Sequence, residues 1–379
     1  MICDFLEEGW PSMDLFGDML CQRFRAEHAS AIEVEQLRPA LHYRFSKIPG
    51  LGRGGFFRNA DRLLNRFHDY PRWLKQRAAG FDLFHLVDHS YSQLILDLPA
   101  EKTVVTCHDL DTFNCLLEPE SDPRPRWFRA MAERTLDGFL GASQVICPSA
   151  FTKANLLRHG LFSADRITVI RPGADPVFFD SHTQAEDAVR PGAAPYLLHV
   201  GSTIRRKRID VLLRVFAGLV SRYPDLRLMR VGSDLTIEQW RLADELGVRD
   251  RVVHSKLLTK QQLAAAYRQA ALVLQTSDAE GFGLPVIESM ACGCPVVASD
   301  IAPLREAGGM TAEYCPVGDI EAWTETVIRL LQERAISPEA WELRRVRARQ
   351  HALGYTWTEN ANQTMSVYQR VCNNLPGRQ

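Results

Sequence analysis

The feature that most constrains how this chain can fold is a strand–loop–helix–strand segment over residues 271–299. Residues 271–275 are apolar and predict a short buried strand, and residues 295–298 predict the next one. Between them, Pro285 suits the first turn of a helix, where a missing N–H costs nothing, and Gly293 suits the end of that helix. The segment therefore predicts two buried strands connected through a helix.

The loop before this helix combines two glycines with two flanking glutamates. Gly281 and Gly283 lie where backbone N–H groups and the helix dipole favour a bound phosphate. Glu280 precedes the glycines, and Glu288 lies about one turn inside the helix. Because carboxylates would not bind the phosphate itself, we expect them to accept hydrogen bonds from hydroxyl groups beside it, such as those of a sugar. The alternative is an ordinary loop with Glu280 solvated and Glu288 on an exposed helix face.

Strand and helix patterns alternate along the whole chain, which predicts an α/β fold. A chain of 379 residues exceeds the usual size of one core, so two domains are expected. We predict two doubly wound, Rossmann-like domains that face a cleft. The predicted ranges are 1–177 for the first domain, 178–195 for a linker, 196–357 for the second domain, and about 358–379 for a last helix that returns to the first domain.

A run of cations follows the first predicted strand of the second domain, residues 196–201. Its members are Arg205, Arg206, Lys207 and Arg208. Beside a glycine loop that binds phosphate, these cations would neutralise a diphosphate. The alternative is a solvated surface patch.

The segment 277–288 closely resembles the E-x7-E segment of the retaining glycosyltransferases of family 4, which have the GT-B fold. This resemblance implies that Glu288 holds the ribose of a nucleoside diphosphate sugar and that Glu280 contacts the hydroxyls of the donor sugar. The backbone of the intervening residues would contact the sugar and the phosphate. These residues are Gly281, Phe282, Gly283 and Leu284.

The resemblance also assigns roles to residues elsewhere in the chain. Arg206 and Lys207 stand where relatives carry Arg-Lys, and Lys256 to Leu258 stand where the family holds the base through backbone groups. His108 lies in a Thr-Cys-His-Asp-Leu segment similar to the family's His-Asp-Leu, which makes it a candidate for contacting the donor sugar or positioning the acceptor. The alternative for His108 is a structural histidine at the end of a strand.

The resemblance implies a retaining transferase that moves mannose or a related hexose to a glycan or lipid-linked acceptor in polysaccharide or glycoconjugate biosynthesis. GDP-mannose is the favoured donor and UDP-sugars come second. We expect no separate cofactor and no metal, because Arg206, Lys207, the loop N–H groups and the helix dipole would stabilise the leaving diphosphate. The alternatives are a UDP-sugar-dependent transferase, a GT-B epimerase or phosphorylase, and a catalytically silent protein that binds a sugar nucleotide.

The composition limits which partners and which cellular compartment are expected. A net charge of -1 and a pI of about 6.8 give no reason to expect nucleic acid. The nine cysteines show no C-x-x-C pair, and most of them are expected to be reduced core residues. With neither a secretory leader nor a long apolar run in the sequence, we expect a cytoplasmic protein, soluble or peripheral on the inner face of the membrane.

Residues 43–80 form a basic segment with interleaved aromatic side chains. Such an amphipathic segment would lie on an anionic membrane surface. The alternative is a solvated helix face whose apolar side packs on the domain.

Overall fold

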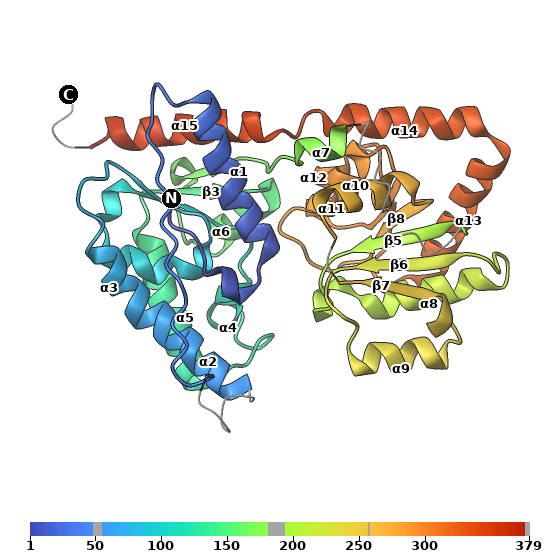
Figure 1. The fold of residues 1–379 in the computed structure, drawn as a ribbon, viewed down its shortest axis with the longest axis horizontal. Coiled ribbons are helices and arrows are strands. Elements are labelled where there is room, and N and C mark those ends of the chain that lie inside the picture. Colours follow the sequence, from blue (N-terminus) through green and yellow to red (C-terminus); the bar gives the residue numbers. More distant parts are fainter. Residues whose placement is uncertain (48–54, 181–193, 257, 376–379) are drawn as a thin grey trace. The chain divides into compact units, whose positions relative to one another are not determined.

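The computed structural model describes residues 1–47, 55–180, 194–256 and 258–375 (Figure 1). The chain divides into two compact units, each with its own parallel sheet, which confirms the predicted α/β class. Unit 1 comprises Met1–Pro172 and Trp357–Gln379, and unit 2 comprises Gly173–Thr356. Most of the predicted linker, residues 181–193, lies outside the described residues.

The sheet of unit 1 has four parallel strands in chain order. They are β1 (Phe84–Leu86), β2 (Thr103–Thr106), β3 (Gln144–Cys147) and β4 (Ile167–Val169). Ile2 adds parallel bridges to Leu86 and Leu37, so the N-terminal residues lie beside β1. Loops that follow these strands therefore meet at one edge of the sheet.

Helices cover both faces of this sheet. They are α1 (Pro11–Glu27), α2 (Gly55–Leu64), α3 (Tyr70–Lys75), α4 (Asn114–Leu117), α5 (Arg126–Gly141), α6 (Ala150–Arg158) and α15 (Trp357–Asn373). A π-helical turn, Asn65–Asp69, joins α2 to α3, and 3-10 turns span Leu6–Glu8, His89–Asp97, Ala100–Lys102, Asp111–Phe113 and Ala164–Arg166. Val104 packs towards α1 and α15 while Val105 packs on the opposite face, as alternation along a doubly covered strand requires.

Unit 2 contains a six-stranded parallel sheet in the order β10-β9-β8-β5-β6-β7. The strands are β5 (Tyr196–Val200), β6 (Arg227–Val231), β7 (Val252–Ser255), β8 (Leu272–Gln275), β9 (Val296–Ser299) and β10 (Glu313–Cys315). The chain runs outward from β5 to β7 and then outward again from β8 to β10, which is doubly wound topology. In such sheets ligands bind outside the carboxyl ends of the strands where the order reverses, here β5 and β8.

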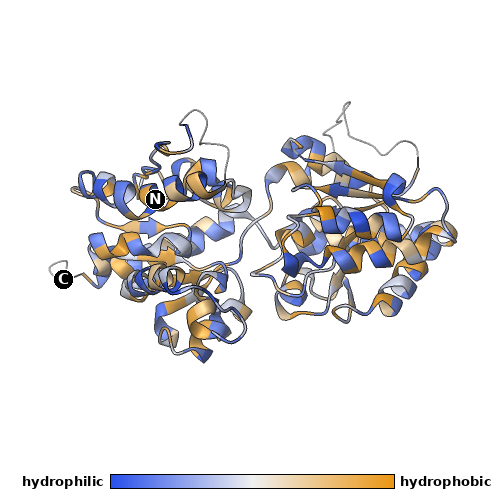
Figure 2. Ribbon diagram, turned by 90° about the horizontal axis from the view of Figure 1, so that it is seen from below, coloured by the Kyte–Doolittle hydropathy of each residue, from blue (hydrophilic) through white to orange (hydrophobic). Residues whose placement is uncertain are grey.

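The helices of unit 2 lie on both sides of the sheet (Figure 1). They are α7 (Pro176–Phe179), α8 (Ile209–Val220), α9 (Ile237–Glu245), α10 (Lys260–Gln269), α11 (Leu284–Ala291), α12 (Ala302–Gly308), α13 (Ile320–Ile336) and α14 (Pro338–Ala352), with 3-10 turns at Arg205–Lys207 and Arg249–Arg251. Helices α10, α11 and α12 pack in one apolar cluster, whereas α8, α9 and α13 pack in another. Figure 2 shows hydrophilic and hydrophobic residues interleaved along these helices, as expected when one side of a helix is buried.

All nine cysteines are free thiols, and Cys372 is the one that is not fully buried. Within the described ranges, no helix has the length and apolar character needed to cross a membrane.

Candidate active site

Two loops of unit 2, after β5 and after β8, are hydrogen-bonded to each other at the carboxyl edge of the sheet. The backbone N–H of Asp278 donates to the carbonyl oxygen of Arg206 at 2.9 Å. The Thr276 hydroxyl donates to the carbonyl oxygens of Lys207 at 3.0 Å and Arg208 at 3.2 Å. The cationic run and the segment that leads to Glu280 are therefore held against one another.

Glu280 pairs with the cations of the neighbouring loop. Its Oε1 accepts hydrogen bonds from Lys207 Nζ at 2.5 Å, from Ser277 Oγ at 2.7 Å and from Gln275 Nε2 at 3.0 Å. Arg206 Nη1 lies 3.7 Å from the other oxygen, Oε2. Burial raises the pKa of Glu280, but Lys207 and Arg206 outweigh it and hold the pKa below its ordinary value. Glu280 is therefore ionised, and Oε2 is the oxygen with more capacity left for a ligand.

The glycine loop ends at the N-terminus of α11, as the sequence predicts. Gly283 is the residue before the helix and has φ 119°, while Pro285 occupies the first turn. A Cβ at Gly283 would lie 2.8 Å from Leu304 Cδ2, so this position requires glycine for both conformation and space. Phe282 is buried against the core and tilted towards the Tyr355 ring. The start of α11 thus presents backbone N–H groups at the carboxyl edge of the sheet.

Glu288 lies inside α11 and is buried, which excludes the exposed helix face considered above. Its Oε2 accepts a hydrogen bond from the Tyr267 hydroxyl at 2.9 Å. Burial raises the pKa of Glu288 to about 7, and repulsion from Asp175 adds to the increase, against the Tyr267 hydrogen bond and the charge of Lys260. Glu288 is therefore a buried carboxyl group that titrates near neutral pH.

The predicted base-binding residues lie just after β7. The Lys256 side chain is 71% exposed, with its Nζ 3.4 Å from Asp234 Oδ2. Leu258 packs against the apolar cluster of α10 and α11, and residue 257 lies outside the described residues.

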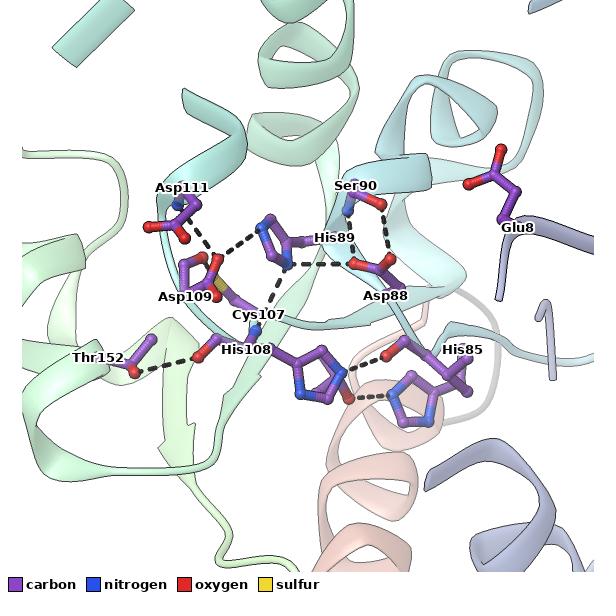
Figure 3. A network of polar contacts seen from close by, with 12 residues as sticks. Glu8, His85, Asp88, His89, Ser90, Cys107, His108, Asp109, Asp111 and Thr152 are labelled. Atoms are coloured by element: carbon purple, nitrogen blue, oxygen red, sulfur yellow. Dashed lines mark hydrogen bonds and ion pairs between the residues drawn. The ribbon is translucent and has the colours of Figure 1, made fainter. Parts of the chain in front are cut away.

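His108 belongs to unit 1, where it follows β2 (Figure 3). Its Nε2 lies 2.7 Å from the carbonyl oxygen of Val87, and its ring meets the Phe16 ring edge-on at 5.2 Å between centroids. Burial lowers the pKa of His108, so the ring is neutral. Because a carbonyl can only accept, Nε2 carries the proton and Nδ1 remains as an acceptor.

Around His108 the structure gathers polar residues that the sequence reasoning did not single out (Figure 3). The His108 backbone N–H donates to His89 Nδ1 at 3.4 Å, and that nitrogen lies 3.3 Å from Asp88 Oδ1. Asp88 also accepts from the Ser90 N–H at 2.8 Å and the Ser90 hydroxyl at 2.6 Å. Asp88 and His89 come just after β1, separated from it by Val87, so their place near a strand end was the signal available in the sequence.

Parallel α/β units, with cations and buried carboxylates beside a helix N-terminus at the switch point of one sheet, are the features expected of a GT-B glycosyltransferase. The comparisons with known proteins agree. Residues 180–349 match the family model for glycosyl transferases group 1, and residues 20–178 match that for glycosyltransferase family 4.

The curated relatives are glycosyltransferases by name. The D-inositol 3-phosphate glycosyltransferase of Arthrobacter sp. is 30% identical over 78% of this chain and 72% of its own length. The enzyme of that name from Mycolicibacterium smegmatis is 33% identical over 58% of this chain, but the match spans only about half, 51%, of that relative. The O-antigen chain mannosyltransferase B of Escherichia coli is 26% identical over 88% of this chain and 87% of its own. The chain therefore belongs to the family 4 glycosyltransferases, enzymes that transfer a sugar from a nucleotide sugar.

Solved structures support the fold. Anabaena HepE, solved with UDP and glucose, aligns over 97% of this chain and 98% of its own with a TM-score of 0.70 at 18% identity.

Proposed function

We propose that this protein is a retaining glycosyltransferase that moves mannose or a related hexose to a glycan or lipid-linked acceptor in polysaccharide or glycoconjugate biosynthesis. The observation that carries the proposal is the contact of Lys207 and Arg206 with Glu280 beside the N-terminus of α11. GDP-mannose is the favoured donor, and the name of the Escherichia coli relative, a mannosyltransferase, supports mannose as the transferred sugar. UDP-sugars come second, since HepE was solved with UDP.

In this proposal the donor diphosphate lies between the cationic loop and the start of α11. Lys207, Arg206 and the N–H groups near Gly283 stabilise the negative charge that develops as the bond between the sugar and the diphosphate breaks. Glu280 Oε2 accepts from a hydroxyl of the donor sugar, and Glu288 accepts from the ribose. His108 would offer its Nδ1 to the transferred sugar or to the acceptor.

Retention of anomeric configuration follows from attack on the same face as the departing diphosphate. The acceptor oxygen forms its bond to the sugar as the phosphate leaves, and the hydroxyl proton passes to a phosphate oxygen. NMR of the product made from an α-linked donor tests this step. A β-linked product would contradict retention.

A thermal-shift screen against GDP, UDP, ADP and their sugar conjugates tests the donor site and selects the base. A ligand that binds the folded state raises the melting temperature by mass action. We expect one base to stand out, GDP before UDP, and the shift to disappear in Glu288→Ala. If none of these nucleotides raises the melting temperature of the wild-type protein, the proposed donor site is contradicted.

We further propose that residues 43–80 contact an anionic membrane surface. Phe56 on α2 is 78% exposed, and Tyr43 and Phe45 are also exposed. Most of the residues that line a cavity of about 590 Å³ belong to this segment, among them Trp73, Arg44, Lys47, Arg72 and the acidic Asp69. Part of the segment, residues 48–54, lies outside the described residues.

Flotation with vesicles of phosphatidylcholine and phosphatidylglycerol tests this contact. The wild-type protein should float with anionic vesicles, and Phe56→Ser combined with Arg72→Ser should reduce the floated fraction. Glu321→Ser on α13 serves as a surface control in unit 2. If the wild-type protein stays at the bottom of the gradient, the membrane proposal is wrong. This outcome would not affect the proposed donor site.

A further inference from the structure

Arg230 is a fully buried cation in the sheet of unit 2. It lies on β6 with 0% of its surface exposed, opposite His199 on β5, which is also fully buried. Its Nη1 lies 3.1 Å from His199 Nδ1, and its Nη2 donates to the carbonyl oxygens of Gly201 at 3.1 Å and Ser233 at 3.0 Å. All of these partners are neutral acceptors, because His199 is the deprotonated, neutral imidazole: burial, Arg230 and Lys207 all lower its pKa.

No carboxylate neutralises this guanidinium within the described part of the chain. Burial lowers the pKa of Arg230 to about 10, and no acidic group acts to raise it. The side chain therefore keeps its charge at neutral pH. Arg230 Nε and His199 Nε2 are also buried without a hydrogen-bond partner. A buried charge without a counter-ion is strongly unfavourable, so the free protein is missing a negative charge near this point.

The unneutralised charge lies next to the loop that carries Lys207. Gly201 ends β5, and a Cβ placed on it would lie 3.4 Å from His199 Cε1 and 3.8 Å from Lys207 Cε. The loop after β6 also lies close to Gly201. A Cβ on Gly232, which has φ 129°, would lie 2.2 Å from the Gly201 carbonyl oxygen. Arg230, His199, Gly201 and Lys207 thus form one contiguous set at the carboxyl edge of the sheet.

We propose that Arg230 is a positioning residue for the diphosphate of the donor, an inference that rests on the proposed donor site. Arg230 holds the carbonyl groups of Gly201 and Ser233, and thereby fixes the start of the loop that presents Arg206 and Lys207. Its charge also attracts the bound diphosphate, which supplies the negative charge that the free protein lacks. The guanidinium acts from within the sheet and does not touch the substrate.

Two substitutions separate the charge from the hydrogen bonds. Arg230→Gln keeps donors for the loop carbonyls but removes the charge, whereas Arg230→Lys keeps the charge. Arg227→Gln is the matched control, because Arg227 lies at the opposite end of the same strand, where its Nη1 donates to the Asp250 carbonyl at 2.7 Å. Calorimetric titration of the folded proteins with GDP and guanosine, and in parallel with UDP and uridine, distinguishes phosphate-dependent from base-dependent binding.

We expect Arg230→Gln to weaken binding of the nucleoside diphosphate by about tenfold and to leave binding of the nucleoside within about twofold. Arg230→Lys should recover much of the loss, and Arg227→Gln should match the wild type. Parallel weakening of diphosphate and nucleoside would mean that Arg230 is only structural, and would overturn the proposal. If Arg230→Gln does not fold, Arg230→Lys alone tests the role of charge. A tenfold loss of affinity for the diphosphate, but not for the nucleoside, in this charged variant would overturn that role.

The donor site and the role of Arg230 fail in different ways. Wild-type protein that binds neither GDP nor UDP contradicts the donor site itself. If the wild-type protein binds GDP or UDP, but no more tightly than Arg230→Gln does, only the role of Arg230 is contradicted.

Discussion

At the scale of single residues, the proposed site depends on how carboxylates and cations are paired. Glu280 has its Oε1 occupied by three donors, while Glu288 has a neutral phenol as its partner. The two glutamates of one motif therefore have opposite electrostatic environments. The pKa of Glu280 is lowered and that of Glu288 is raised to about 7.

Lys207→Ala should abolish sugar transfer while the protein remains folded. The substitution removes one of the two cations proposed to stabilise the diphosphate, and loss of one such stabilising group lowers kcat by about 100-fold or more. The measurement is the transfer rate with the donor that the thermal screen selects, together with circular dichroism. Arg214→Ala is the control, because Arg214 is an exposed cation on α8. A wild-type rate in Lys207→Ala would remove this residue from the site.

Glu288 should make donor binding depend on pH. The ribose hydroxyls donate to the ionised carboxylate, so affinity for the nucleoside should rise as the pH increases through about 7. Titrations with guanosine or uridine between pH 6 and pH 8 measure this effect without ionisation of the phosphates. Glu288→Gln should show a flat profile, and a flat profile in the wild type would contradict the assignment.

The same carboxyl group links pH to stability with a known sign. Its folded pKa of about 7 lies above the ordinary glutamate pKa of 4.5, so the protonated form is favoured on folding. The resulting stabilisation is fully present below pH 4.5 and is lost as the pH rises through about 7. Relative to Glu288→Gln, the melting temperature of the free wild-type protein should therefore fall across this range.

At the scale of elements, one loop and one helix connect the sheet of unit 2 to its site. The loop after β8 carries Glu280, and α11 begins directly after Gly283. The sequence predicted this strand–loop–helix order because Pro285 and the glycines restrict the backbone locally. It did not predict the contacts of Gln275 and Ser277 with Glu280, because nothing local sets where those side chains meet.

Gly283→Ala should destabilise the protein and weaken donor binding together. The residue has φ 119°, and the added Cβ would lie 2.8 Å from Leu304 Cδ2, so the buried Leu304 side chain, the loop or α12 must shift. We expect a loss of about 1–3 kcal/mol in the free energy of unfolding, measured by urea denaturation. Gly141→Ala is the control, since its Cβ would meet only Ile95 Cγ2 at an ordinary 3.7 Å. Equal stability of both variants would show that the loop adapts without strain.

At the scale of the whole molecule, each unit has its own core. The two apolar clusters of unit 2 use only residues between 174 and 355, whereas α15 contributes Trp357, Ala361 and Tyr368 to a cluster of unit 1. The C-terminal helix therefore completes the first unit, although it follows the second unit in the chain.

A fragment spanning residues 173–356 should fold alone and retain nucleotide binding. It contains both clusters and every proposed donor residue of unit 2, but not His108. Calorimetry should give an affinity for the selected nucleoside diphosphate close to that of the full chain, without transfer activity. The complementary fragment 1–172 lacks α15 and should not fold. An unfolded 173–356 fragment would contradict the independence of the two units.

The amino-acid sequence by itself determined the α/β class, the order of strand, loop and helix over residues 271–299, and the glycine loop before α11, because these depend on short-range periodicity and backbone restriction. The resemblance of residues 277–288 also pointed to the family that the comparisons then showed. Only the tertiary structure decided which polar side chains meet: Lys207 and Glu280 are 73 positions apart, and Arg230 and His199 are 31 apart. Such pairings are set by strand order and register, and these depend on the packing of the whole sheet.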